Sequence, residues 1–142
     1  MTAQAVTAAQ TRPLRQRVLR PHQRADEIVL PGDDDPRALH AGVFADGALV
    51  AVGSVFPDPE APDAAWRVRG MATDPAWQGQ GAGRQVLDAL LAHAWAQGGE
   101  RVWCNARTTA AGFYLKAGLR QVGDVFELPR IGPHVVMEIQ RP

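Results

Sequence analysis

A glycine-rich turn that leads directly into an apolar-periodic helix constrains this chain most strongly. The stretch from Arg67 to Arg84 begins as a strand, breaks at Asp74-Pro75 and turns through residues 78–83, Gln-Gly-Gln-Gly-Ala-Gly. The first N–H groups of a helix lack intrahelical acceptors, and the helix dipole favours negative charge there. Glycines leave room for phosphate oxygens and tolerate positive φ. The pattern predicts an anion-binding loop; the alternative is a glycine-rich helix start without a ligand.

Three kinds of phosphate-binding loop compete for this stretch. A Walker loop requires Gly-Lys-Ser/Thr, but Gly83 is followed by Arg84 and Gln85. A Rossmann fingerprint requires a third glycine at position 84, which is arginine, although Glu100 lies near the spacing of a ribose-binding acid. The third pattern, Gln/Arg-x-x-Gly-x-Gly/Ala, fits residues 78–83 at every position. We therefore favour the third pattern.

Composition excludes several classes of protein. A chain of 142 residues is long enough for a core, and we expect one domain over residues 1–142. The net charge of zero does not indicate a surface for nucleic acid or for an anionic membrane. Cys104 is the only cysteine, which excludes an intrachain disulfide and a cysteine metal cluster. Without a signal peptide or an apolar run of membrane length, the expected location is cytoplasmic, and no metal site is expected.

Hydrophobic periodicity and turn residues predict an α+β order of elements. Asp46-Gly47 is a hairpin signal, and Gly98-Gly99 ends the helix that follows the glycine loop. The expected elements are a short strand at 4–6, a helix capped by Thr7 or Thr11 with Pro13 in its first turn, strands at 39–44, 48–56 and 66–73, a helix at 80–97, a strand at 101–107, a helix at 110–117 capped by Thr108 or Thr109, and strands at 119–128 and 134–140.

Several charged or special positions have two interpretations. The arginines of the first helix (Arg12, Arg15, Arg17 and Arg20) either wall an acceptor pocket and meet an acidic acceptor, or form a solvated face. We expect Asp33 to Asp35 to form a solvated acidic turn, with a cation or a cationic amine as alternative ligands. Gly53 within its strand indicates a bulge or a close backbone approach. We expect His40 to be structural.

A second motif follows the glycine loop by about thirty residues. It runs from Asn105 to Leu119 and contains Phe113-Tyr114-x-x-x-Gly. The two motifs together resemble the GNAT N-acetyltransferase superfamily over roughly residues 12–140, with slightly altered spacing and Leu119 in place of the usual Phe. Residues 126–137 resemble small bacterial members, among them the ElaA-like ones. The resemblance implies an α+β fold: a mixed, mostly antiparallel sheet, helices on both faces and a splayed strand pair for acyl-CoA.

The resemblance also implies an acetyl-CoA site and roles for its residues. It places a backbone N–H near Met71 or Ala72 beside the thioester oxygen, and it makes Tyr114 the general acid that protonates the leaving thiolate. The residues implied to hold acetyl-CoA are Gln78, Gly79, Gln80, Gly81, Ala82, Gly83 and Arg84 at the diphosphate, and Met71, Ala72, Thr73 and Asn105 along the pantetheine arm and thioester.

The general base stays open at this point. His134, Glu127 and His40 are candidates, and a water chain is an equal alternative. Cys104 lies within a strand without an obvious base, so we expect a buried, inert thiol and direct transfer in a ternary complex. The expected function is transfer of an acetyl group from acetyl-CoA to a primary amine of a small molecule. The alternative is a non-catalytic acyl-CoA sensor, and a homodimer is compatible with the resemblance.

Overall fold

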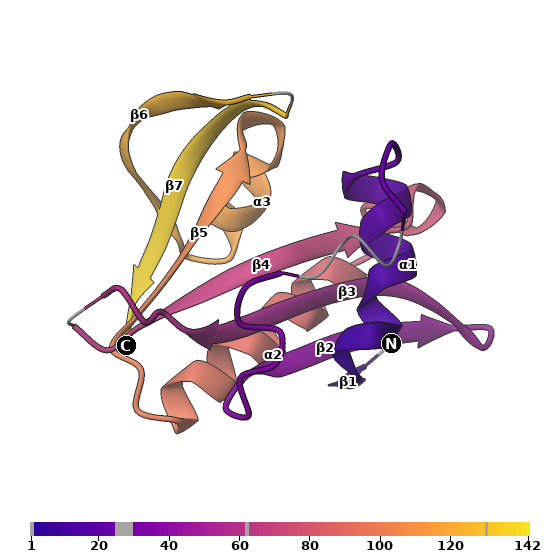
Figure 1. Ribbon diagram of the computed structural model, residues 1–142, viewed down its shortest axis with the longest axis horizontal. Helices are drawn as coiled ribbons and strands as arrows, with labels where there is room; N and C mark the ends of the chain where they lie inside the picture. Colours follow the sequence, from indigo (N-terminus) through magenta and orange to yellow (C-terminus); the bar gives the residue numbers. More distant parts are fainter. Residues whose placement is uncertain (1, 25–29, 62, 130) are drawn as a thin grey trace.

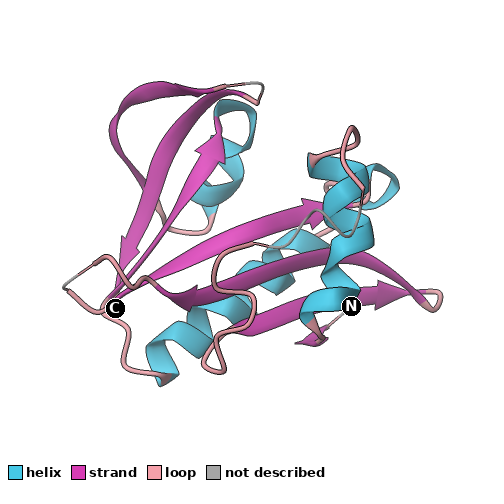
Figure 2. Ribbon diagram, in the orientation of Figure 1, coloured by secondary structure: helices cyan, strands magenta, loops and turns pink. Residues whose placement is uncertain are grey.

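Seven strands form one sheet in the order β1-β2-β3-β4-β5-β7-β6 (Figures 1 and 2). The computed structural model describes residues 2–24, 30–61, 63–129 and 131–142. Of the strand pairs in the described residues, β4–β5 is parallel and the others are antiparallel, which confirms the expected mixed sheet. The elements are β1 Ala3–Ala5, α1 Ala8–Leu19, β2 Leu39–Ala45, β3 Ala48–Pro57, β4 Ala65–Thr73, η2 Pro75–Trp77, α2 Ala82–Ala96, β5 Arg101–Arg107, η3 Thr108–Ala110, α3 Ala111–Lys116, β6 Arg120–Leu128 and β7 Gly132–Gln140.

Helices α1 and α2 cover opposite faces of the β2–β4 part of the sheet, as Figure 1 shows. The apolar stripe of α2 packs with Val43 and Val55 in the main core, whereas Leu14 of α1 packs with Val52 and Ala72 in a smaller cluster. Because side chains alternate between the faces of a strand, β3 contributes to both clusters and is buried along most of its length. No helix in the described residues is long and apolar enough to cross a membrane.

The β2–β3 hairpin turns at Asp46 and Gly47, as predicted. Both residues have positive φ, 51° and 78°, which is the geometry that a tight two-residue hairpin turn requires. Beyond the turn the register shifts once, between Val43 and Phe44, and the strands then pair regularly as far as Leu39 and Val55.

A bulge interrupts the pairing of β3 with β4 at Gly53, which confirms the expectation for that glycine. The register shifts between Val52 and Ser54, so Gly70 and Met71 of β4 share the place opposite Gly53. Gly70 has φ 67°, and a Cβ there would overlap the guanidinium group of Arg15. A Cβ at Gly53 would overlap the Met71 Sδ atom. The bulge thus lets α1 approach β4 closely and bends the strand just before the glycine loop.

The strands β4 and β5 separate soon after they begin. Their pairing covers Ala65 with Arg101, Trp66 with Val102, and Arg67 with Trp103. Beyond Arg67, β4 pairs with β3 and β5 pairs with β7, and the two strands diverge (Figure 1). This confirms the splayed strand pair, and it leaves strand edges with backbone donors and acceptors facing the opening.

The expected cap at Thr7 is confirmed, but two other expectations about helix starts are wrong. Thr7 caps α1 in a capping box with Gln10, and Pro13 therefore lies in the helix interior rather than in the first turn. The interior Pro13 has no N–H to donate to the carbonyl of Ala9. Neither Thr108 nor Thr109 caps α3, because both form a 3-10 turn first and Ala110 stands at the N-cap position.

The expectation of a solvated acidic turn is wrong for Asp33, which is 5% exposed. Its carboxylate lies 3.4 Å from Nη1 of the fully buried Arg15 and accepts the Leu30 N–H at 3.0 Å. Arg15 also donates to the hydroxyl of Ser54, which lies 2.6 Å from His40 Nδ1. His40 Nε2 donates to the Asp33 carbonyl at 3.0 Å. This network fastens α1 to β2 and β3, and it gives His40 its structural role.

The other two aspartates of the turn do behave as surface groups. Asp34 is exposed, and Asp35 pairs with Arg37 at 3.1 Å. Among the described residues, no group of His, Cys, Asp or Glu side chains is arranged to hold a metal ion.

We predict that Asp33→Ala destabilises the fold by about 3–5 kcal/mol, because it leaves the buried Arg15 charge uncompensated. Urea unfolding measures the change as a lower midpoint at an unchanged slope. The matched control is the exposed neighbour Asp34→Ala, for which we expect a change within about 0.5 kcal/mol. Equal midpoints for the two variants would contradict a stabilising buried pair.

Candidate active site

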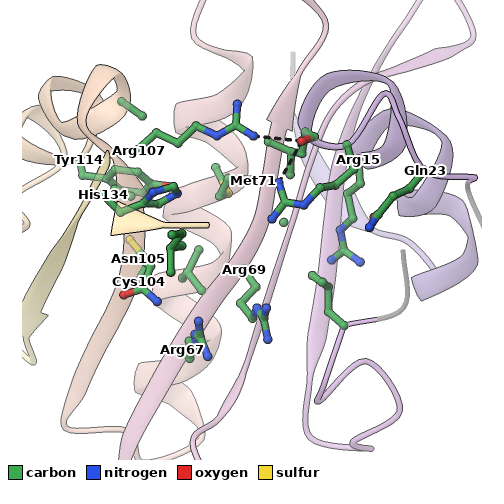
Figure 3. A pocket seen from close by; sticks show the side chains of 18 residues that line it. Arg15, Gln23, Arg67, Arg69, Met71, Cys104, Asn105, Arg107, Tyr114 and His134 are labelled. Atoms are coloured by element: carbon green, nitrogen blue, oxygen red, sulfur yellow. Dashed lines mark hydrogen bonds between the residues drawn. The ribbon is translucent and has the colours of Figure 1, made fainter. Parts of the chain in front are cut away.

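Two cavities meet where β4 and β5 separate. The loop cavity, about 640 Å³, is lined by the glycine loop, the end of β4 and α3. The arginine cavity, about 230 Å³, lies between α1 and strands β4, β5 and β7 (Figure 3). Their shared lining residues are Leu19, Met71, Arg107, Ala110 and Tyr114. The arrangement suits a reaction between two molecules that approach from opposite sides.

The loop cavity presents backbone donors at the start of α2. Gly81 is the N-cap residue, with φ 90°, and no side chain caps the helix. Gly79 has φ 77°, and a Cβ at either glycine would meet no atom within 4 Å. Gly83 has a different role, because a Cβ there would lie 3.0 Å from Thr73 Oγ1. The first N–H groups of α2 therefore remain available to an anion, as the sequence pattern predicts.

Most residues that the resemblance assigns to acetyl-CoA do line the loop cavity. Gln80 lines neither cavity, and its side-chain amide lies 3.4 Å from the Ala76 carbonyl. Asn105 lines the arginine cavity instead. Arg84 lies at the loop cavity but also pairs with Asp88 at 2.9 Å. The assigned residues that the loop cavity brings together are Met71, Ala72, Thr73, Gln78, Gly79, Gly81, Ala82, Gly83 and Arg84.

Sequence reasoning missed several lining residues of the loop cavity. Trp77 and Phe113 carried a signal, since each is a large apolar residue beside a motif already recognised. The contributions of α1 depend on tertiary packing alone. The missed residues are Val18, Leu19, Trp77, Arg107, Thr109, Ala110 and Phe113.

Tyr114 lies at the junction of the two cavities. It is 6% exposed, and burial, followed by the neighbouring Cys104 thiol, raises the pKa of Tyr114 well above its ordinary value. The hydroxyl therefore keeps its proton at neutral and mildly alkaline pH. A protonated hydroxyl at this position can donate a hydrogen bond or a proton to a group held between the cavities.

Of the three side chains considered as base, the structure brings His134 to a cavity. His134 is 5% exposed and lines the arginine cavity. Its Nδ1 atom lies 2.8 Å from the Gly132 carbonyl, which can only accept, so Nδ1 carries the proton and Nε2 of the neutral ring is an acceptor. Glu127 is exposed, and neither Glu127 nor His40 lines either cavity.

Cys104 is the buried, inert thiol that the sequence indicates. It lines the arginine cavity beside Tyr114, and burial raises the pKa of Cys104 to about 12, against smaller opposing effects of Tyr114 and Arg67. The thiolate, which is the nucleophilic form, is therefore almost unpopulated at neutral pH.

Most of the charged side chains that line the arginine cavity are arginines. Arg67 lies 4.5 Å above the ring of Trp103, and Arg69 follows two residues later on β4. Burial, together with Arg67, Arg15 and Arg20, lowers the pKa of Arg69 to about 10, despite the opposing effect of Asp33. Sequence reasoning missed Arg67 and Arg69, although their spacing of two along a strand places both on one face.

The first-helix arginines divide between the two interpretations. Arg15 and Arg20 line the arginine cavity, whereas Arg17 is exposed and pairs with Asp74 at 3.1 Å. One helix therefore supplies both a cavity wall and a solvated face.

Comparison with known proteins identifies the family. The sequence model of the family described as "Acetyltransferase (GNAT) family" matches residues 4–119 of this chain. YitI of Bacillus subtilis (strain 168), described as an uncharacterized N-acetyltransferase, is 35% identical over 135 residues, which cover 93% of this chain and 91% of YitI. This chain belongs to the GNAT acetyltransferase family. Membership confirms the superfamily resemblance, and it makes the protein an acyltransferase whose family binds an acyl-CoA and an acceptor.

Solved structures show the same fold. Escherichia coli ElaA superposes with a TM-score of 0.77 at 17% identity, covering 96% of each chain. An aminoglycoside 6′-N-acetyltransferase complexed with coenzyme A superposes with a TM-score of 0.76 at 13% identity, covering 100% of this chain and 99% of that one. At such identities the similarity establishes the GNAT fold of this chain.

We predict that Cys104 resists alkylation in the native protein. With a pKa of about 12, raised from its ordinary value, about one thiol in ten thousand is ionised at pH 8, and this fraction rises about tenfold per pH unit. Iodoacetamide labelling followed by mass spectrometry should be at least a hundredfold slower for native protein than for protein in urea. Equal rates in the two conditions would show a reactive thiol and reopen covalent transfer through Cys104.

Proposed function

We propose that this protein transfers an acetyl group from acetyl-CoA to a primary amine of a small molecule, directly within a ternary complex. The observation that carries the proposal is the meeting of the loop cavity and the arginine cavity at Met71 and Tyr114. One cavity offers phosphate-binding geometry and the other offers a base. The acetyl group would pass between them at the junction.

The residues of the loop cavity fit acetyl-CoA. The uncapped start of α2 supports a diphosphate site, because its N–H groups and the helix dipole favour phosphate oxygens. The edge of β4 that β5 leaves unpaired offers backbone groups of Met71 and Thr73 to the amides of the pantetheine arm. When bound, acetyl-CoA supplies an activated acyl group. We assign Asn105 to the acyl end, since its side chain lies on the acceptor side.

Three further groups would act on the reacting atoms: a base, a backbone donor and an acid. His134 Nε2 takes the proton that the amine loses as the nitrogen–carbon bond forms. A backbone N–H at Met71 or Ala72 stabilises the negative charge on the carbonyl oxygen. Tyr114 gives its hydroxyl proton to the sulfur as the carbon–sulfur bond breaks. The products are an N-acetylated amine and free CoA, with no covalent enzyme intermediate, and a proton passed through solvent from His134 back to Tyr114 restores the starting enzyme.

We predict that Tyr114→Phe lowers kcat about a hundredfold or more, while the Kd for acetyl-CoA changes less than about twofold. The variant keeps the buried ring and removes only the proton donor. Release of CoA measures kcat, and isothermal titration measures Kd. Since burial raises the pKa of Tyr114 above its ordinary value, the parental rate should show no loss from Tyr114 ionisation up to about pH 10. A variant that acetylates at the parental rate would remove Tyr114 from the mechanism.

We predict that Gly81→Glu abolishes acetyl-CoA binding, because the new side chain is strained at φ 90° and places negative charge at the start of α2. Gly98→Glu is a matched control, since Gly98 also has φ 90° and open space around it but lies beyond the other end of α2. Titrations with acetyl-CoA, NAD and ATP compare the two variants with the parent. Unchanged binding by Gly81→Glu would refute the loop assignment, whereas specific binding without turnover on an amine panel would favour a sensor.

A further inference from the structure

The arginine cavity carries an excess of positive charge although the whole chain has a net charge of zero. Five arginines line it, and no carboxylate is among the described lining residues. The carboxylate of Asp33, which does not line the cavity, compensates the charge of Arg15. The other four are Arg20, Arg67, Arg69 and Arg107, and none forms an ion pair with a described residue. The charge is therefore concentrated on one surface.

Two pairs of these arginines lie close together. Arg20 Nη1 and Arg107 Nη2 donate to the same Leu19 carbonyl, at 2.9 and 3.0 Å, and Figure 3 shows Arg107 reaching toward α1. Arg67 and Arg69 project from one face of β4, and the two are labelled at one end of the cavity in Figure 3. Guanidinium groups that lie this close together repel one another, and a bound anion would offset the repulsion within each pair.

Hydrogen-bond donors on Arg67 and Arg69 without partners in the described part of the chain also indicate an anionic ligand. The Nε atom of Arg67 is buried and has no hydrogen-bond partner among the described residues. Arg69 forms no hydrogen bond with them, and both arginines line the cavity. Buried donors are normally satisfied, and a ligand in the cavity would supply the acceptor that the buried Arg67 Nε atom lacks. A planar guanidinium fork matches the oxygens of carboxylate or phosphate in particular.

We propose that the acceptor is an amine that also carries an anionic group, a carboxylate or a phosphate, and that Arg67 and Arg69 determine this specificity by binding that group. The inference rests on the proposed acetyl transfer. Along β4, Arg69 lies two residues before Met71, and Arg67 lies four residues before it at the end where β4 still pairs with β5. The anionic group would therefore lie toward the β4–β5 pairing and the amine toward Tyr114 and His134.

Matched acceptors test the proposal. Glycine, β-alanine and 5-aminopentanoate are each compared with the corresponding amide, which keeps the amine and the shape but removes the negative charge. Phosphoethanolamine and ethanolamine form the phosphate arm. We expect kcat/KM, measured by CoA release, to be at least tenfold higher for the anionic member of the best pair, and to fall with added salt. The two arms distinguish a carboxylate from a phosphate.

Variants assign the preference to residues. Arg67→Gln and Arg69→Gln should each reduce the anionic-to-neutral ratio at least tenfold, mainly through KM for the anionic member, whereas Arg69→Lys should restore part of it. Arg37→Gln is the control, since Arg37 is exposed and lines neither cavity. Thermal unfolding checks that each variant is folded. A ratio near one in the parent, or a ratio unchanged in both glutamine variants, would overturn the inference while leaving acetyl transfer intact.

Failure of the proposed function has a different signature. If acetyl-CoA binds but no amine is acetylated, isothermal titration of the CoA-saturated protein with the same pairs still decides the inference. At least tenfold tighter binding of an anionic member, lost in Arg69→Gln, would support it. Equal binding of both members of every pair would overturn it.

Discussion

The separation of β4 from β5 after Arg67 is the constraint on which both cavities depend. If the strands remained paired, their edges would be satisfied and the space between them filled. The bulge opposite Gly53 interrupts the regular pairing of β4 with β3, and Gly70 leaves room for Arg15 of α1 to lie against the strand. That buried guanidinium is tolerable because Asp33 lies beside it. The Arg15–Asp33 pair thus holds α1 against the strands that form the arginine cavity.

Local features of the fold could be predicted from the sequence because their causes are local. Asp46-Gly47 adopts the positive φ values that its residue types favour. The apolar stripe of α2 is buried as its period predicts. The start of α2 stays open because Gly79 and Gly81 carry no side chain, and this depends on neighbouring residues alone.

Features that depend on distant partners could not be predicted in the same way. The burial of Asp33 follows from its contact with Arg15, eighteen residues earlier, and Arg15 is itself held by the hydroxyl of Ser54. The position of Asn105 in one cavity rather than the other follows from how far β5 swings from β4. The spacing of two between Arg67 and Arg69 predicts that both lie on one face of their strand. The sequence does not show that α1 lies opposite this face and completes a cavity with it.

The use of arginine in the lining of the arginine cavity has a consequence for an acyltransferase. A catalyst that acylates amines endangers any amine of its own that reaches the transferred group. Guanidinium groups stay protonated at neutral pH, even Arg69 with its pKa lowered to about 10. The sequence has one lysine, Lys116, which is exposed at the end of α3 and lines neither cavity. Positive charge is thus supplied to the cavity without a lysine amine that would compete for the acyl group.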